Sequence, residues 1–455
     1  MSASGDRRAT MRIGADVVVA GGGAAGVAAA VTAARLGLDV VLVERYGFCG
    51  GGAVAGMSGT VCGLYEASEH AGAGPRQVVF GFADEFVRLL ESRGGLTPPL
   101  RYGKTWTRVH DPLMWREAAD HLLREAGVRV LFHSVVTGTL LDGDRVTGVV
   151  AWSKEGPIEL RARLAIDASG DADLVAMSGF ESFIGADGAV QNPTMIFRLG
   201  AVDVGRFRAA YGDDTIMPEP VSALLREHHG KGYALPRSKI WLFPTTRPGE
   251  LLCNCTRVVG ADGRELNTLF ARDFTDAEFE GRLQVREYAR FFRDHLAGCE
   301  NAYVVDTGVQ VGVRQTRQAR GVATLANADI LAGRKFADAI ARSPWPIELH
   351  SGVRPRVEWL LDDWYEVPFG CFVPRRGDGL LTAGRCLSAQ HEAVASARVT
   401  AQCFSYGHAI GHAAAMSLES GIQPRALPGQ AVRAALDRDG ARLGEEAIAI
   451  SEETP

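Results

Sequence analysis

The sequence of 455 residues lacks long apolar runs and a strong excess of one charge. Outside the first apolar segment, no stretch of about 18 apolar residues is free of charge and glycine, so we expect no transmembrane helix. The net charge of −5 disfavours nucleic acid and anionic membranes as partners. Residues 1–14 lack the apolar middle of a signal peptide, and we therefore expect a cytoplasmic protein.

The cysteines are too scattered to form a metal site or a redox pair. None of the eight belongs to a C-x-x-C motif or to a zinc-binding spacing. We therefore expect reduced thiols and no bound metal, as is usual for a cytosolic protein.

A glycine-rich segment near the start of the chain predicts a nucleotide site. Residues 17–45 read VVVAGGGAAGVAAAVTAARLGLDVVLVER, which indicates a buried strand, a tight turn, a helix and a second strand. Gly21, Gly23 and Gly26 form G-x-G-x-x-G. The first glycine allows the turn, the second admits a pyrophosphate, and the third lets the helix lie close to the strand. Glu44 follows about 20 residues later, where a carboxylate can bond a ribose hydroxyl.

The rest of the chain predicts an α/β fold with an insertion. The length allows two or three domains, and 46% hydrophobic residues are typical of a globular protein. Residues 180 to about 350 carry many aromatic residues and arginines and no second glycine fingerprint. We expect a Rossmann-like nucleotide-binding domain (parallel sheet, helices and a β-meander) in two parts, 13–178 and 354–424, an inserted α+β substrate or cap domain, 179–353, and a C-terminal tail, 425–455.

Two helices are indicated by the residues at their ends. Asp111 is suited to an N-cap because a proline follows at the first helical position. A long helix is expected from Ser396 to Gly421, since glycine commonly ends a helix. Small residues at every fourth position give this helix one face for close contact: Gly407, Gly411 and Ala415.

Four short segments carry a family resemblance when they are taken together. They read ERYGFCGG (44–51), IDASGDAD (166–173), GVRQTR (312–317) and AGRCLSAQHEA (383–393). This set resembles the bacterial FAD-dependent oxidoreductase family, whose FAD domain is of the glutathione-reductase type. The resemblance extends from about residue 14 to 422 and is least specific between 180 and 300.

The resemblance implies FAD as the cofactor. Val135 or Val136 would offer backbone to the adenine, and Gly384 and Arg385 would lie along the ribitol, where related families have an aspartate in place of Arg385. The helix from Ser396 would point its positive end at the flavin pyrimidine ring. The residues expected at the cofactor are Gly21, Gly23, Ala24, Ala25, Gly26, Glu44, Arg45, Cys49, Gly50, Gly51, Val135, Ala168, Ser169, Gly170, Gly384 and Arg385.

We expect the catalytic groups between the ribitol segment and the flavin-facing helix. His391 is the expected proton acceptor, because a chain that passes from ribitol to pyrimidine crosses near the reactive edge of the flavin. Glu392 and Arg398 either assist it or tie the loop to the FAD domain. Arg314, with Arg317, either binds an anionic substrate or the flavin carbonyls, or forms a structural ion pair. Further candidates are His110, His350 and Tyr65.

Cys49 carries a separate hypothesis. It interrupts a segment in which relatives often have an aliphatic residue. If the segment runs beside the flavin, the thiol contacts the ring or bonds to it covalently. The alternative is a small apolar residue that fills space.

The reaction class is inferred from two absences. The chain has no second nucleotide fingerprint and no redox C-x-x-x-x-C, which NADPH-linked disulfide reductases carry. We therefore predict a dehydrogenase or oxidase that moves a hydride from a small organic substrate to flavin N5, with oxygen or a carrier protein as electron acceptor. A flavin monooxygenase reduced by NAD(P)H and a non-catalytic FAD-binding module are the alternatives. The oligomeric state stays open.

Overall fold

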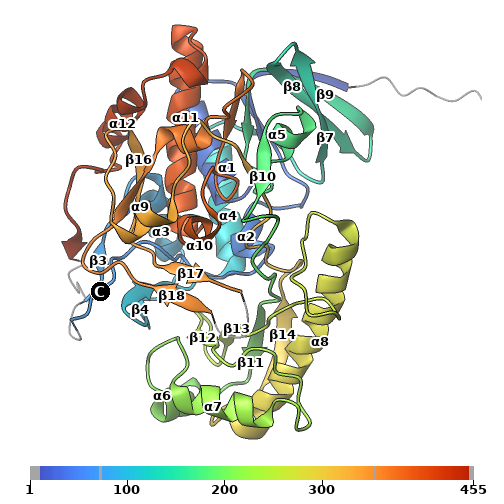
Figure 1. Ribbon diagram of the computed structural model, residues 1–455, viewed down its shortest axis with the longest axis vertical. Helices are drawn as coiled ribbons and strands as arrows, with labels where there is room; N and C mark the ends of the chain where they lie inside the picture. The colour runs from blue at the N-terminus through green and yellow to red at the C-terminus, as the bar shows by residue number, and fades with distance from the viewer. Residues whose placement is uncertain (1–10, 71–73, 352–354, 450–455) are drawn as a thin grey trace, which may run out of the picture.

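A seven-stranded sheet forms the centre of the larger lobe, at the top of Figure 1. The computed structural model describes residues 11–70, 74–351 and 355–449. The strands run in the order β6 (Arg129–Leu131), β2 (Val40–Val43), β1 (Met11–Ala20), β9 (Gly156–Asp167), β8 (Arg145–Ser153) and β7 (Val135–Asp142), and β20 (Leu380–Thr382) also pairs with β9.

Strand β9 joins the two parts of this sheet. Its inner edge is parallel to β1, whereas its other edge pairs with the antiparallel β8 first and with the parallel β20 at its end. The last four residues of β1 are buried, as expected for a strand covered on both faces. The predicted Rossmann-like α/β fold with a β-meander is confirmed.

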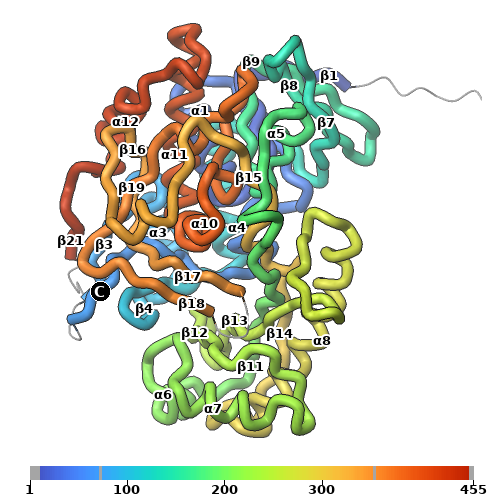
Figure 2. The backbone as a smooth tube through the Cα atoms, viewed as in Figure 1, coloured from blue at the N-terminus to red at the C-terminus, as the bar shows by residue number. Residues whose placement is uncertain are grey.

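Helix α11 (Thr400–Ser420) packs closely against α1 (Ala24–Arg35), although the two lie far apart in the sequence (Figure 2). A Cβ atom added to Gly407 would stand 2.1 Å from the carbonyl oxygen of Ala25, and one added to Gly411 would stand 2.6 Å from Cβ of Thr32. The predicted close helix contact is therefore confirmed, and glycine is required at both positions.

Two further helices cover the same face of the sheet. In α4 (Pro112–Glu125) the side chain of Asp111 accepts hydrogen bonds from the backbone N–H groups of Leu113 and Met114, so the predicted N-cap is confirmed. Helix α3 (Phe82–Ser92) packs beside α4 and α11 through its apolar face.

The smaller lobe, at the bottom of Figure 1, has its own antiparallel sheet and core. Its helices pack the buried side of this sheet, and Tyr288 and Phe292 of the long helix are fully buried. Its elements are β11 (Phe197–Gly200), α6 (Val204–Tyr211), α7 (Glu219–His228), β12 (Trp241–Pro244), β13 (Leu251–Asn254), α8 (Ala271–His295) and β14 (Tyr303–Thr307).

The chain returns to the larger lobe before the boundary that the sequence predicts at residue 353. Ile340 and Ile347 belong to the core of the larger lobe. The strands concerned are β15 (Arg317–Ala319), paired with β10 (Ser182–Ile184), β16 (Ala339–Ser343), paired with β19 (Tyr365–Pro368), and β17 (Ile347–Leu349), paired with β18 (Arg356–Glu358).

Two features of the C-terminal part differ from expectation. The predicted helix from Ser396 is divided into α10 (His391–Ala397) and α11, because Val399 is extended with ψ of 164°. The predicted tail after residue 424 contains α12 (Gly429–Arg438), whose Val432 and Leu436 are buried in the main core. The expected end of the long helix at Gly421 is confirmed by its left-handed conformation.

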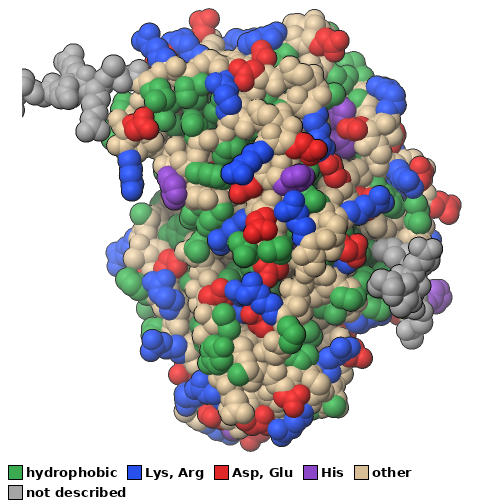
Figure 3. Space-filling view, turned by 180° about the vertical axis from the view of Figure 1, so that it is seen from behind, with side chains coloured by type: hydrophobic (Ala, Val, Ile, Leu, Met, Phe, Trp, Pro, Cys, Tyr) green, Lys and Arg blue, Asp and Glu red, His purple; other side chains and the backbone are tan. Residues whose placement is uncertain are grey.

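The remaining elements are short. They are α2 (Gly51–Val54), β3 (Arg76–Gln77), β4 (Leu100–Tyr102), β5 (Thr105–Thr107), α5 (Asp173–Met177), α9 (Asn327–Leu331), η1 (Phe369–Phe372), η2 (Pro424–Ala426) and β21 (Ile448–Ala449). None of the helices in the described ranges is long and apolar enough to cross a bilayer. Basic and acidic side chains are interspersed over the face shown in Figure 3.

Candidate active site

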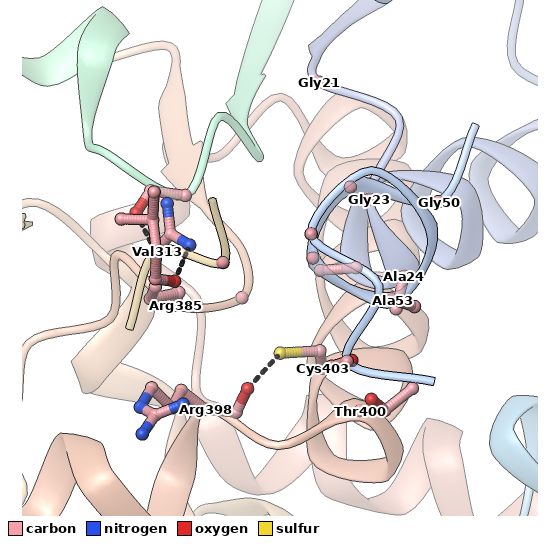
Figure 4. Close-up of a pocket in the computed structure, with 18 of the residues that line it drawn as sticks. Gly21, Gly23, Ala24, Gly50, Ala53, Val313, Arg385, Arg398, Thr400 and Cys403 are labelled. Atoms are coloured by element: carbon pink, nitrogen blue, oxygen red, sulfur yellow. Dashed lines mark hydrogen bonds between the residues drawn. The ribbon is translucent and has the colours of Figure 1, made fainter. Parts of the chain in front are cut away.

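A cavity of about 340 Å³ begins at the carboxyl ends of β1, β2 and β9 and continues to the strands of the smaller lobe. Ligands of α/β sheets bind at such strand ends. Figure 4 shows Gly21, Gly23 and Gly50 on one side of this cavity and Val313 and Arg385 on the other. The cavity is therefore elongated between two walls that come from distant parts of the chain.

The three fingerprint glycines are required for three different reasons. Gly21 has φ of +102°, and a Cβ there would stand 2.6 Å from the carbonyl oxygen of Ala168. A Cβ on Gly26 would stand 1.9 Å from the carbonyl oxygen of Gly21, so Gly26 serves the packing of helix on turn. At Gly23 the nearest atom is 4.0 Å away, and its missing side chain leaves space in the cavity itself. This space fits the close approach of a pyrophosphate.

Glu44 lies at the end of β2 and lines the cavity. Its carboxylate accepts hydrogen bonds from the backbone N–H groups of Gly22 at 2.7 Å and Tyr46 at 2.9 Å. Burial raises the pKa of Glu44, and these hydrogen bonds oppose the rise. The carboxylate oxygens retain lone pairs for a hydroxyl group in the cavity.

Most of the residues expected at the cofactor lie together. Arg385 is fixed by donation to the carbonyl oxygens of Gly170 and Val313 and by an ion pair with Asp171 at 2.7 Å. Its guanidinium group is thus committed to protein partners on the wall opposite the glycine loop. The expected residues that line the cavity are Gly21, Gly23, Ala24, Ala25, Glu44, Arg45, Gly50, Gly51, Val135, Ala168, Ser169, Gly170, Gly384 and Arg385.

Cys49 does not line the cavity, although it lies beside the glycine loop. It is fully buried, and a Cβ on Gly22 would stand 2.7 Å from its Sγ atom. Burial and the nearby Glu44 raise the pKa of the Cys49 thiol well above its ordinary value. The side chain thus packs behind the loop as a small apolar group.

At its inner end the cavity reaches a cluster of polar side chains from both lobes. Arg314 and Arg398, two of the expected catalytic residues, line this end. The Tyr102 hydroxyl donates to Oε1 of Glu348 at 2.7 Å, and Nε2 of His350 lies 3.7 Å from the same oxygen. Tyr102, Glu348 and His350 also line the cavity.

A second contact of His350 settles which of its ring nitrogens carries a proton. Arg237, behind His350, donates from Nη2 to Nδ1 of the imidazole at 2.8 Å. Because arginine can only donate, Nδ1 is an acceptor and the neutral ring carries its proton on Nε2, facing Glu348. Burial and the charge of Arg314 lower the pKa of His350 well below its ordinary value, so the ring is neutral at pH 7.

Glu348 is ionised within this cluster. Burial acts to raise its pKa, but His350, the Tyr102 hydroxyl and the charge of Arg237 outweigh burial and lower the pKa. Burial also raises the pKa of Tyr102 well above its ordinary value, which keeps its hydroxyl protonated. The inner end therefore offers one carboxylate that can accept a proton.

His391 and Glu392 lie outside the cavity lining, at the first turn of α10. Glu392 forms an ion pair with Arg356 at 2.5 Å, and His391 faces the turn at Gly185. Burial lowers the pKa of His391. The structure does not bring these two residues to the inner end, because α10 begins outside the cavity lining and reaches it only at Ala395.

The remaining catalytic candidates from the sequence lie outside the cavity lining and contact other parts of the protein. Arg317 donates to the Asp171 carbonyl and forms an ion pair with Asp173 at 2.7 Å. His110 and Tyr65 are buried outside the cavity lining.

Tyr102 and Glu348 were missed in the sequence, whereas His350 was named among the lesser candidates. The segment IELH contains the available signal: in a strand, residues i and i+2 point to the same face, so Glu348 and His350 share one side of β17 and its end. Nothing near Tyr102 in the sequence indicates its partner.

The division of the long helix brings the start of α11 to the cavity. Val399 and Thr400 both line it, and Figure 4 shows Thr400 and Cys403 facing the same space as Arg398. The first N–H groups of a helix carry a partial positive charge, which favours an anionic group placed there. The helix begins at Thr400 instead of the expected Ser396, and its orientation toward a flavin ring stays a prediction.

Comparisons with known proteins identify a family whose nucleotide-binding fold agrees with the one described above. The sequence profile of the family described as FAD dependent oxidoreductase matches residues 16–436. Over 160 residues, which is 34% of this chain and 37% of the relative, the sequence is 34% identical to digeranylgeranylglycerophospholipid reductase 2 of Methanopyrus kandleri. The match thus spans little more than a third of that relative.

The fold is shared with a solved structure of low sequence identity. A geranylgeranyl bacteriochlorophyll reductase-like protein from Thermoplasma acidophilum superposes with a TM-score of 0.50 and 15% identity, covering 95% of this chain and 85% of that chain. The flavin-dependent brominase Bmp2 gives a TM-score of 0.49 and 15% identity over 93% of this chain and 83% of its own. The glycine cradle at Gly21 and Gly23 fits the FAD that this family uses.

Proposed function

Because this chain belongs to the FAD-dependent oxidoreductase family and its cofactor is FAD, we propose that it is a dehydrogenase or oxidase acting on a small organic substrate. The observation that carries the proposal is the continuity of one cavity from the glycine loop to a buried, ionised carboxylate, Glu348. We assign the FAD domain to the glutathione-reductase type, on the order of its strands and its meander.

The residues of the outer cavity would hold FAD. Glu44 would bond the ribose, Gly23 and the first turn of α1 would face the pyrophosphate, and Gly384 would lie along the ribitol. When bound, FAD supplies at N5 the acceptor for a hydride. The start of α11 at Thr400 would favour negative charge on the pyrimidine side of the ring system.

The cluster of Tyr102, Glu348 and His350 at the inner end would accept the proton that the substrate loses in the same reaction. The substrate loses a hydride from carbon and a proton from its heteroatom, so two electrons leave and a C=O or C=N bond forms. Glu348 accepts the proton, because it is the ionised carboxylate that faces this space. Tyr102 and His350 are positioning residues: the Tyr102 hydroxyl donates a hydrogen bond to Glu348, and Nε2 of His350 lies 3.7 Å from the same oxygen. Oxygen, reduced to hydrogen peroxide, or a carrier protein then takes the two electrons.

We also propose a cytoplasmic location. The eight cysteine thiols are free, which is typical of a reducing compartment.

Anaerobic screening tests the proposed reaction. The FAD-loaded protein is mixed with alcohols and amines in the absence of oxygen, and the visible absorption of the flavin is followed. Bleaching by one substrate class supports the proposal. Rapid bleaching by NADPH alone would indicate a monooxygenase, and a flavin that no metabolite reduces would indicate a non-catalytic FAD-binding module.

A further inference from the structure

The inner end of the cavity holds more positive than negative charge. Three guanidinium groups, those of Arg237, Arg314 and Arg398, surround the carboxylate of Glu348. Arg237 and Arg314 are 3% and 6% exposed. Because arginine stays protonated in proteins, the cluster is a buried site with excess positive charge.

Within the described residues, the two arginines that line the cavity donate hydrogen bonds to neutral acceptors only. Arg314 donates to the Asn192 carbonyl at 2.7 Å and to the Asn254 side chain at 3.4 Å. Arg398 donates to the Gln191 side chain at 3.1 Å, while its buried Nε has no partner in this part of the chain. These guanidinium groups therefore retain donors and charge for a group that enters the cavity.

The lowered pKa values of Arg314 and Arg398 also favour an anion in the cavity. Burial and the charges of Arg237 and Arg398 lower the pKa of Arg314, and burial lowers the pKa of Arg398 to about 10. Both shifts mean that the protein disfavours these charges in the absence of an anion. Binding an anion between them would remove the repulsion and satisfy the open donors.

The walls beside the arginines are aromatic. Tyr102, Phe243 and Trp345 line the same end of the cavity. The ring centroids of Tyr102 and Trp345 are 5.0 Å apart, and those of Tyr102 and Phe243 are 6.2 Å apart. Such walls bind an apolar body, so the space combines one anion-binding corner with apolar sides.

We propose that Arg314 and Arg398 bind the carboxylate of a small organic acid, which is the substrate, and that the aromatic walls contact its apolar part. This substrate class rests on the proposed oxidoreductase function. A carboxylate suits the planar fork of arginine. A phosphate dianion suits the site less, because the ionised Glu348 belongs to the same cluster.

Spectral titration of the FAD-loaded protein tests the proposal without turnover. The probes are benzoate and butyrate, each with its neutral amide, and phenyl phosphate. The flavin absorption reports binding nearby. We expect saturable changes with at least one acid and binding of that acid at least about tenfold tighter than its amide, since hydrogen bonds to charged groups contribute more than neutral ones.

Substitution of the two arginines tests whether they bind the acid. Arg314→Gln and Arg398→Gln are each expected to weaken binding of the acid by roughly 10-fold to 100-fold with full FAD content. The matched control is Arg247→Gln, which removes a positive charge at an exposed position of the smaller lobe where Arg247 pairs with Asp111. Its binding of the acid is expected to equal that of the wild type.

Four results would overturn the proposal: no binding of either acid, equal binding of acid and amide, tighter binding of phenyl phosphate, or unchanged binding in both cavity variants. Loss of FAD from these variants would also overturn it, because the arginines would then hold the flavin. A wild-type protein that binds the acid but is reduced by no substrate would contradict the proposed function and leave acid binding in place.

Discussion

Tyr102 donates a hydrogen bond to Glu348 at 2.7 Å across 246 residues of sequence, and the two side chains are buried at the same end of the cavity. The contact joins the end of β4 to the middle of β17. It places an ionised carboxylate where a substrate proton can be accepted. We therefore expect Glu348 to accept the proton and Tyr102 to hold Glu348 in position.

Replacing Glu348 by glutamine tests its role as the proton acceptor. The amide keeps the shape of the side chain and its contact with Tyr102 but cannot take up a proton. We expect Glu348→Gln to keep FAD and to slow substrate-driven flavin reduction by at least about 10²-fold, since loss of a general base costs roughly 10²–10⁴-fold. Stopped-flow reduction measures this rate. Tyr102→Phe, which removes only a positioning hydrogen bond, should lose less.

The pH dependence separates Glu348 from a histidine. Its pKa is lowered, so the carboxylate remains ionised through the neutral range and activity falls only when it is protonated. We expect the acid limb of kcat/KM below about pH 4, the ordinary range of a glutamate. In Tyr102→Phe the limb should move to higher pH, because the lost hydrogen bond stabilises the carboxylate. A limb near the ordinary histidine pKa that vanishes in His391→Gln would return His391 to the mechanism.

A side chain at Gly23 should prevent FAD binding. The space above Gly23 belongs to the cavity, with no atom nearer than 4.0 Å, so a valine there would stand where the pyrophosphate lies. We expect Gly23→Val to fold and to be purified without flavin, as measured by absorption of the released cofactor. The control is Gly14→Val, an exposed strand position with open space around it. Full flavin content in Gly23→Val would refute the assignment of the loop.

The flavin should be released by acid, because Cys49 packs behind the glycine loop and does not line the cavity. After precipitation with acid we expect all flavin in the supernatant. Cys49→Ala should bind the same amount of FAD and lose only some packing. Flavin that stays with the precipitated wild type and is freed in Cys49→Ala would show a covalent link.

Buried His110 should make the protein less stable at acid pH. Neither of its ring nitrogens has a hydrogen-bond partner among the residues that the structure describes, and burial lowers its pKa to about 4. The unfolded chain takes up a proton near pH 6.5, whereas the folded protein does so only near 4, so stability falls as pH decreases between these values. The loss by pH 4 is about 3 kcal/mol.

His110→Leu removes this titration. Urea unfolding of both proteins between pH 7 and 4 measures the effect, and the variant is expected to lose less stability over this interval. Each protein is compared with itself at pH 7, so a change in packing does not affect the test. Parallel profiles would show that His110 is not the group responsible.

The glycine loop could be predicted from the sequence because its constraints are local. Gly21, Gly23 and Gly26 act within six residues, and Glu44 follows one strand later. Likewise, Asp111 caps the helix that it precedes. These features need no knowledge of the partner lobe.

The inner end could not be predicted because it is formed by contacts across the chain. Arg314 meets Asn192 and Asn254, and Tyr102 meets Glu348, only after segments that lie far apart in the sequence have packed together. The break at Val399 was missed for another reason: no glycine or proline marks it, and the β-branched pair Val399 and Thr400 is only a weak sign of a helix end. His391 begins α10, and this helix reaches the cavity only at Ala395.

Anaerobic mixing of the FAD-loaded protein with small 2-hydroxy and 2-amino acids tests the central claim most directly. We predict that at least one acid bleaches the flavin, that its neutral amide does so far more slowly, and that oxygen or an artificial carrier restores the colour. A flavin that is bleached by NADPH and by none of these acids would show that the protein is not a dehydrogenase or oxidase of small organic acids.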